Sequence, residues 1–237
     1  MMSTPVWSGS MRWMILRPSC IPSVAGDGDG RRLVLLYHGD TAGSGGRCIG
    51  RSEVPLSASG RQQMETLASA WTYPAPTLLV ASSRQRSYAA LVSFARRFGR
   101  LPQVDARLDE QDFGDWDGEP WSLLHGRGDH GLQQWLADWS GQAPPGGESF
   151  AQMAQRCGGW LDETVASAGD DDLLLVASHA GPLRALACHA LSIPLQHALL
   201  LRMDHAHVSA MRRRRGRFEL CYWNASHFEA GLFGDHP

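Results

Sequence analysis

The chain has 237 residues, a formal net charge of −2 and a hydrophobic fraction of 43%. This length suits one full-sized α/β core, so we expect one folded domain. The nearly balanced charge gives no overall field that would attract nucleic acid or an anionic membrane surface, and we expect neither as a partner. The apolar runs fall short of a membrane span, and the sequence shows no internal repeat.

All 22 positively charged side chains are arginine, because the sequence contains no lysine. A phosphate-binding P-loop needs its lysine and a Schiff-base enzyme needs an amine, so both classes are excluded. An anion bound through a side-chain cation must therefore be held by arginine or protonated histidine. The five cysteines are odd in number and include no C-x-x-C pair. This usage favours a reducing cytoplasm over a disulfide framework or a zinc ribbon.

In the first half of the chain, the sequence pattern predicts two strands and two helices after an N-terminal extension. Residues 1–32 join a short apolar patch to a Gly- and Asp-rich stretch, and we predict a flexible N-terminal extension ahead of a domain at 33–237. The run LVLLY at 33–37 predicts a strand buried on both faces, and residues 77–83 predict a second. Ser57 caps the first predicted helix, and RSYAALVSFARRF forms the next.

The second half continues the alternation of helices and strands. The segment LQQWLADW places four apolar residues on one helical face: Leu132, Trp135, Leu136 and Trp139. Ser149 caps a further helix, and residues 171–181 predict a third buried strand leading into a helix. Residues 207–223 predict a hairpin with its turn at Gly216. We therefore predict an α/β three-layer sandwich, with helices on both faces of a mostly parallel central sheet.

Each of the three strongest predicted strands is followed by a polar side chain that could take part in catalysis or ligand binding. The first strand is followed by His38, the second by Ser82 with Arg86 four residues later, and the third by His179. Carboxyl ends of neighbouring parallel strands meet in one crevice, so we expect these groups to converge. Helices that begin there aim backbone N–H groups at the same place, which favours an anion such as phosphate.

Two imidazoles and a guanidinium around an anion suggest phosphoryl transfer. One imidazole would attack phosphorus while the other, protonated, would stabilise the equatorial oxygens. A proton donor for the leaving oxygen should be a carboxylic acid near the crevice, and Glu110 and Asp112 are the candidates.

Four ordered blocks resemble the histidine phosphatase superfamily, the phosphoglycerate-mutase-like enzymes. They are YHGDTAGSGGRCIGRSEVPLSASGRQQ at 37–63, LLVASSRQR at 78–86, LDEQDFGDWDG at 108–118 and LLLVASHAGPLRAL at 173–186. The segment 132–156 looks most like the branch that contains α-ribazole phosphatases, which remove the 5′-phosphate of α-ribazole phosphate in cobalamin assembly. The resemblance implies the phosphoglycerate-mutase-like fold and hydrolysis of a small phosphomonoester.

The resemblance also implies a role for each matching residue. His38 is the nucleophile that forms phosphohistidine, Glu110 is the proton donor to the leaving alkoxide, and His179 stabilises the transition state. Arg47 and Arg86 bind phosphate. No metal and no organic cofactor is implied.

The family's arginine before the nucleophile is Tyr37 in this chain. A phenol donates one hydrogen bond but carries no charge at neutral pH, so Tyr37 is a weaker phosphate-binding group than a guanidinium. Losing one preorganised donor costs on the order of 10² to 10³ in rate. Weakened but measurable activity is therefore expected, with Arg84, Arg47 or Arg51 as a replacement cation and Arg84 preferred.

Three functions fit these residues. The first is an α-ribazole 5′-phosphate phosphatase, the second a phosphoglycerate-mutase-like or broad-specificity phosphatase, and the third a non-catalytic phosphate-binding protein. The sequence indicates no oligomeric state.

Several other features favour structural roles. Helical spacing favours core packing for Trp135 and Trp139, whereas Trp116 and Trp121 could equally form a lid over an aromatic substrate. The RRRRGR run at 212–217 suits the turn of a solvated hairpin better than nucleic-acid binding. The DHAH stretch at 204–207 has metal-ligand residue types, but in a strand it could not bring all three to one face.

Overall fold

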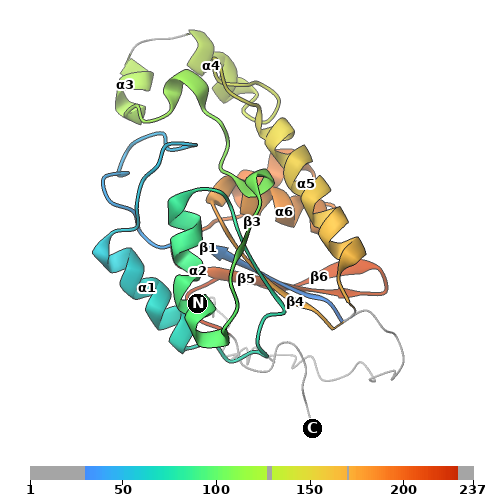
Figure 1. Ribbon diagram of the computed structural model, residues 1–237. Coiled ribbons are helices and arrows are strands. Elements are labelled where there is room, and N and C mark those ends of the chain that lie inside the picture. Colours follow the sequence, from blue (N-terminus) through green and yellow to red (C-terminus); the bar gives the residue numbers. More distant parts are fainter. Residues whose placement is uncertain (1–29, 127–129, 170, 229–237) are drawn as a thin grey trace, which may run out of the picture.

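A computed structural model describes residues 30–126, 130–169 and 171–228 (Figure 1). Most of the predicted extension at 1–32 therefore lies outside the described residues. Within them a six-stranded sheet has the order β3-β2-β4-β1-β5-β6. The strands are β1 (Arg32–Tyr37), β2 (Leu78–Ala81), β3 (Gln103–Val104), β4 (Leu173–Ser178), β5 (Val208–Arg214) and β6 (Arg217–Ala225).

The four strands from β3 to β1 run parallel, whereas β5 and β6 are antiparallel additions at one edge. The three strands with predicted chemistry, β2, β4 and β1, are direct neighbours in the middle of the sheet. The predicted mostly parallel sheet is confirmed.

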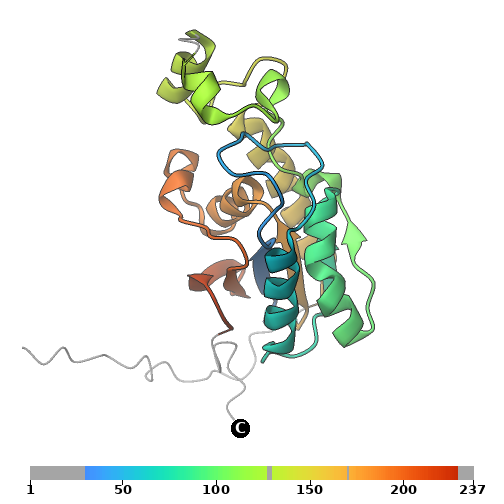
Figure 2. The same cartoon turned by 90° about the vertical axis from the view of Figure 1, so that its left-hand side faces the viewer.

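Helices cover both faces of the sheet: Figure 1 shows α1 and α2 on one side and α5 and α6 on the other, and Figure 2 turns α1 and α2 toward the viewer. The first layer contains α1 (Ala58–Ser69) and α2 (Gln85–Phe98), and the second contains α5 (Phe150–Ser167) and α6 (Ala180–Leu191). Side chains alternate across the pleat of β1: Val34 and Leu36 join the core under α1 and α2, and Leu33 and Leu35 join the core under α5 and α6. The fold is the predicted α/β three-layer sandwich.

The predicted helix caps are present. Ser57 accepts a hydrogen bond from the Gly60 N–H at the start of α1. Ser149 and Gln152 form a reciprocal capping box at the start of α5. Gly39 lies so close to α1 that a Cβ there would sit 2.5 Å from the Gly60 carbonyl oxygen. The glycine after His38 therefore lets α1 begin directly against the end of β1.

A smaller unit, which we call the cap, lies beyond the carboxyl end of the sheet, at the top of Figure 1. It contains the 3₁₀ turn η2 (Gly114–Trp116) and the helices α3 (Trp121–Gly126) and α4 (His130–Ala137), and the 3₁₀ turn η1 (Ala106–Leu108) precedes it. Its own apolar cluster consists of Cys48, Trp116, Leu124 and Leu132, with Phe113, Trp121 and Trp135 packed against them.

The predicted apolar face at 132–139 is only partly correct. Because α4 ends at Ala137, the four side chains do not share one helix. Leu132 and Trp135 join the cap cluster, Leu136 is 45% exposed, and Trp139 packs against Phe150.

The C-terminal part contains the 3₁₀ helix η3 (Leu195–Leu200) and the predicted hairpin of β5 and β6, which turns at Arg215 and Gly216. The strand predicted over residues 204–207 is wrong, because these residues form a turn before β5. Ala206 adopts a left-handed φ of +58°, and its N–H donates to the carbonyl oxygens of both Tyr37 and His38. Among the described residues, no helix combines the length and apolarity needed to span a membrane.

Candidate active site

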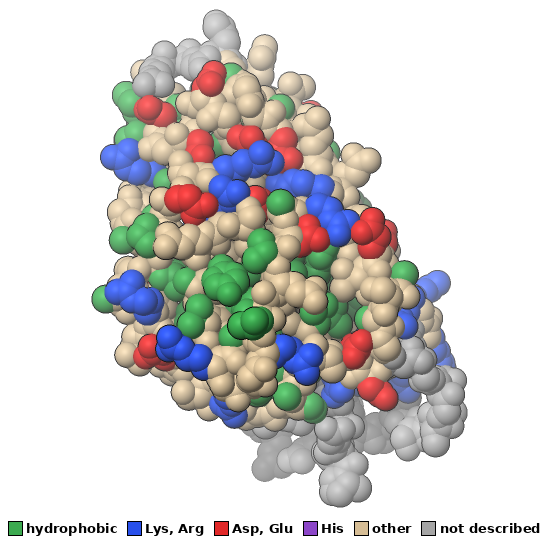
Figure 3. All heavy atoms as spheres, viewed as in Figure 1, with side chains coloured by type: hydrophobic (Ala, Val, Ile, Leu, Met, Phe, Trp, Pro, Cys, Tyr) green, Lys and Arg blue, Asp and Glu red, His purple; other side chains and the backbone are tan. Residues whose placement is uncertain are grey.

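The ends of β1 and β4 bring two imidazoles together. These strands pair in parallel with Tyr37 opposite Ser178, so the residues that follow them, His38 and His179, also lie side by side. Their ring centroids are 5.2 Å apart at an interplanar angle of 74°. Both side chains are buried, with exposed fractions of 4% and 1%. Accordingly, no histidine surface is visible on the face shown in Figure 3.

The hydrogen bond of His38 determines which ring nitrogen is free. Its Nδ1 lies 2.8 Å from the carbonyl oxygen of Gly39. A carbonyl only accepts, so Nδ1 carries the hydrogen and Nε2 carries the lone pair. Burial lowers the pKa of His38 to about 3. His38 is therefore an unprotonated imidazole with Nε2 available as a nucleophile.

His179 is oriented by Ser82 and Arg86. The Nε of Arg86 donates to Nδ1 of His179 at 3.1 Å, and Nε2 of His179 lies 2.7 Å from Ser82 Oγ. Because arginine is only a donor, Nδ1 holds a lone pair and the ring hydrogen is on Nε2, from which it donates to Ser82. Burial and the charge of Arg86 hold the pKa of His179 well below its usual range. His179 is therefore neutral in this arrangement, and its protonated state during phosphoryl transfer stays a prediction.

Arg86 provides a buried guanidinium beside the two histidines. Only 2% of the residue is exposed. Its Nη1 donates to the Ser52 carbonyl oxygen at 2.8 Å, and its Nη2 donates to that of Gly50 at 2.7 Å. Together with the bond to His179, these contacts use three of the five N–H donors. The remaining two make no hydrogen bond to another described residue.

Glu110 lies at the start of α6, close to His179. Its Oε1 accepts from the Gln111 N–H at 2.9 Å, and its Oε2 accepts from the Gly181 N–H at 3.4 Å. A Cβ on residue 181 would sit 2.2 Å from Oε1, so only glycine leaves room for this carboxyl. Burial raises the pKa of Glu110, against the opposing effect of its backbone hydrogen bonds and of the Arg86 charge. Glu110 is thus prone to carry a proton.

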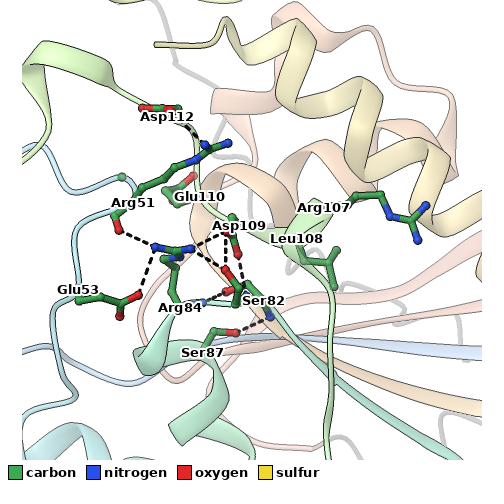
Figure 4. Close-up of polar contacts among 12 residues, drawn as sticks. Arg51, Glu53, Ser82, Arg84, Ser87, Arg107, Leu108, Asp109, Glu110 and Asp112 are labelled. Carbon is green, nitrogen blue, oxygen red and sulfur yellow. Dashed lines mark hydrogen bonds and ion pairs between the residues drawn. The ribbon is translucent and has the colours of Figure 1, made fainter. Parts of the chain in front are cut away.

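Asp112, the other candidate proton donor, is engaged elsewhere. Its Oδ2 pairs with Nη1 of Arg51 at 3.2 Å, and its Oδ1 accepts from the Gly114 N–H. Figure 4 shows this pair above the Glu110 side chain. The geometry favours Glu110.

Residues 33–226 match the family model for the histidine phosphatase superfamily, branch 1. The chain belongs to this superfamily.

Relatives of the chain include proteins named as phosphatases. It is 33% identical over 175 residues to glucosyl-3-phosphoglycerate phosphatase of Mycobacterium tuberculosis, covering 70% of this chain and 77% of the relative. It is 29% identical over 187 residues to adenosylcobalamin/α-ribazole phosphatase of Escherichia coli K12, covering 76% of this chain and 89% of the relative. The predicted enzyme class, a phosphatase, is confirmed.

Solved structures agree with the predicted fold. The native mycobacterial glucosyl-3-phosphoglycerate phosphatase superimposes with a TM-score of 0.75 at 31% identity, over 83% of this chain and all of the other. The α-ribazole phosphatase of Shigella flexneri superimposes with a TM-score of 0.77, over 84% of this chain and 98% of the other. Its 23% identity supports the fold only.

The predicted replacement cations of this histidine phosphatase are held by other groups. Arg84, the preferred one, pairs with Asp109 at 3.1 Å and Glu53 at 3.2 Å (Figure 4). Arg51 pairs with Asp112, and the exposed Arg47 donates to the Gly118 carbonyl oxygen at 2.8 Å. Figure 3 shows arginine and acidic side chains interleaved in one band across this face. The structure therefore does not support Arg84 as the substitute, and a phosphate-binding role for Arg47 stays a prediction.

Tyr37 points toward the histidine cluster of the phosphatase and stacks on a residue that the sequence analysis missed. Its ring centroid lies 4.4 Å from that of His205 at 29°, and 4.8 Å from that of His38 at 67°. His205 itself lies 5.3 Å from His38. The sequence signal for His205 is the histidine-rich stretch at 204–207, but a strand there would not predict its position beside Tyr37. Among the described residues, no three His, Cys, Asp or Glu side chains form a metal-binding group.

Proposed function

We propose that this phosphatase hydrolyses a small phosphomonoester through a phosphohistidine at His38. In the first step Nε2 of His38 forms a bond to phosphorus as the ester P–O bond breaks, and Glu110 gives its proton to the leaving alkoxide. In the second step water attacks phosphorus as the bond from phosphorus to Nε2 of His38 breaks, the Glu110 carboxylate takes a proton from that water, and phosphate leaves. The observation that carries this proposal is the hydrogen bond from Nδ1 of His38 to Gly39, which leaves Nε2 unprotonated beside His179 and Arg86.

The transferring phosphoryl group would be held by the two remaining N–H donors of Arg86. His179 would exchange Ser82 for a phosphoryl oxygen, and so donate its Nε2 hydrogen to the transition state. Arg47, exposed on the loop after β1, would reach the phosphate from outside.

We further propose α-ribazole 5′-phosphate as the substrate. The relative in E. coli named for this activity supports the assignment. A second argument is that the cap contains the partly buried aromatic side chains Phe113, Trp121 and Trp135, while Arg51 and Arg84 are already paired with carboxylates. A leaving group that is aromatic and uncharged suits these surroundings better than one that carries a carboxylate.

Glucosyl-3-phosphoglycerate is the second candidate. It is favoured by the 33% identity to the mycobacterial enzyme named for it. This substrate carries a carboxylate, so its binding would require Arg51 or Arg84 to exchange its carboxylate partner.

A substrate panel tests both assignments. The full chain is assayed with α-ribazole 5′-phosphate, glucosyl-3-phosphoglycerate and p-nitrophenyl phosphate, beside His38→Asn. We expect α-ribazole 5′-phosphate to give the highest kcat/KM and His38→Asn to abolish turnover of all three. Rapid quenching should trap an acid-labile phosphoenzyme in the wild type only. Turnover that survives in His38→Asn would refute the mechanism, whereas a higher kcat/KM for glucosyl-3-phosphoglycerate would refute only the substrate.

A further inference from the structure

A phosphoryl group carries up to two negative charges, and Arg86 offers one buried positive charge to it. The chain has no lysine, Arg51 and Arg84 are paired with acids, Arg47 is exposed on the loop after β1, and Arg184 donates to the Leu201 carbonyl oxygen. Further positive charge directly beside His38 can come from a side chain that takes a proton. The cluster holds three imidazoles: His179, His38 and His205. Their hydrogen bonds decide which one can become an imidazolium.

His38 and His179 cannot do so in their present arrangement. A proton on Nε2 of His38 would remove the lone pair that attacks phosphorus, because Nδ1 already donates to Gly39. A proton on Nδ1 of His179 would face the N–H of Arg86, which donates to that nitrogen. Protonation would therefore disable the first ring and break the hydrogen bond that orients the second.

His205 has no such constraint. Within residues 30–126, 130–169 and 171–228, neither of its ring nitrogens makes a hydrogen bond to protein, and its side chain is partly exposed. Asp40 and Asp204 both act to raise its pKa, while Arg86 and burial act to lower it. An added anion would tip this balance toward the charged form.

The backbone fixes the position of His205. The Ala206 N–H donates to the carbonyl oxygens of Tyr37 and His38 at 3.1 Å, and the Tyr37 N–H donates to the His207 carbonyl oxygen at the same distance. The left-handed φ of Ala206 is unfavourable for a residue with a Cβ, so these bonds must hold the turn in place. From the other side, the Asn224 amide bonds both the N–H and the carboxylate of Asp204.

We propose that His205 is a further phosphate-binding residue, which contacts a phosphoryl oxygen as an imidazolium, and that Tyr37 positions it by stacking on its ring. This inference rests on the proposed function, because it places the phosphoryl group beside His38. The proton comes from solvent when the anion binds and returns to solvent when the anion leaves.

The sign of the pH dependence follows from the groups around the ring. Tyr37, His38 and Asp40 face His205 from the end of β1, Asp204 from its own turn and Arg86 from α2. Burial lowers the pKa of His205, so at neutral pH the free enzyme holds it neutral. A bound dianion raises that pKa. Anion binding should therefore take up a proton and weaken as pH rises.

Sulfate is a suitable probe because it remains a dianion throughout the neutral range. Its binding to the full chain is measured by calorimetry between pH 6 and 8. Repeating the titration in buffers of different ionisation enthalpy gives the number of protons taken up when sulfate binds. We expect proton uptake by the wild type. His205→Asn should lose that uptake and bind sulfate more weakly, on the order of tenfold or more, as for a lost charge-assisted hydrogen bond. His205→Arg, with its permanent charge, should regain affinity without uptake.

Three further variants complete the test. Tyr37→Ala removes the ring that stacks on His205 and should reduce both the proton uptake and the sulfate affinity, whereas Glu110→Gln shows whether the proton goes to that carboxyl instead. His189→Asn, beside Asp162 on the exposed side of α6, is the matched histidine control. Absence of proton uptake in the wild type, or its survival in His205→Asn, would overturn the inference. Neither result depends on the assay of His38→Asn, so failure of the catalytic mechanism is seen separately.

Discussion

At the scale of single residues, the effect of Glu110 on kcat/KM should be larger the more basic the leaving oxygen is, because Glu110 supplies the proton to that oxygen. With an alkyl phosphate, Glu110→Gln should lower kcat/KM by about 10² to 10⁴, because the alkoxide then leaves unprotonated. With p-nitrophenyl phosphate, whose leaving group needs little protonation, the loss should be small. The raised pKa of Glu110 keeps its acid form to higher pH than a free glutamate, and wild-type turnover of the alkyl ester should fall as pH rises through that pKa. An equal loss for both esters would contradict this role, and Asp112→Asn is the control.

Gly181 should affect the same proton transfer sterically, because it leaves room for the Glu110 carboxyl. An added Cβ would meet the Glu110 carboxyl at 2.2 Å, so Gly181→Ala must displace that group. We expect the selective loss of alkyl phosphate turnover seen in Glu110→Gln, with p-nitrophenyl phosphate largely spared. Gly159→Ala is the control, since that exposed helical glycine has open space around its Cβ position and the change should stabilise α5 by about 0.5–1 kcal/mol. Steady-state kinetics and urea unfolding separate the two effects.

The positions of His38, His179 and Arg86 were predictable from sequence because each follows a run of apolar residues that clearly predicts a buried strand. Parallel pairing of these strands then places the three side chains at the same edge of the sheet. His205 could not be placed in this way, since its position depends on the left-handed turn at Ala206 and on bonds to the backbone of β1. Nor could the neutral state of His179 be predicted, because it depends on which ring nitrogen faces Arg86.

At the scale of elements, α5 holds the loop that presents Glu110. Arg156 of α5 donates to the carbonyl oxygens of Arg107 and Glu110 at 2.7 and 3.1 Å, and pairs with Glu148 at 2.6 Å. Arg156→Met would leave those acceptors without their donor, and we expect a loss of about 1–3 kcal/mol in the free energy of unfolding. Turnover of alkyl phosphates should fall more than that of p-nitrophenyl phosphate, because the proton donor is misplaced.

Arg107→Gln is the matched control for Arg156. Its guanidinium binds Asp105 and Glu163 at the exposed surface, where ion pairs contribute about 1 kcal/mol or less. Denaturant unfolding and kinetics on both esters should show little change. Equal losses in the two variants would mean that α5 does not position Glu110.

The helices and strands of the sandwich were predictable because hydrophobic periodicity and capping residues agree locally, as at Ser57 and Ser149. The cap was harder to predict. Its helices α3 and α4 are short, and its cluster joins Trp116 and Trp135 to Cys48 from the loop after β1. Such contacts between distant segments leave no periodic signal, which is why the face assigned to 132–139 divides between two clusters.

At the scale of the whole molecule, buried imidazoles link folding to pH. The folded state keeps His38 and His179 neutral, with pKa values below the 6.5 expected of the unfolded chain, about 3 for His38. Below pH 6.5 the unfolded chain binds protons that the folded chain does not. Each histidine therefore contributes stability that is present above pH 6.5 and is lost as pH falls toward the folded pKa. The raised pKa of Glu110 acts in the opposite direction, since its folded state holds a proton more tightly.

This linkage gives the active site a measurable effect on stability. Within that window each buried histidine should remove about 1.4 kcal/mol of unfolding free energy per pH unit. Urea unfolding of the wild type at pH 7 and pH 5 should show a fall of a few kilocalories per mole. The asparagine in His38→Asn does not titrate between pH 5 and pH 7, so this variant should lose less unfolding free energy than the wild type. If the two proteins lose stability equally between these pH values, His38 does not titrate as a buried imidazole, and its unprotonated Nε2 would need another explanation.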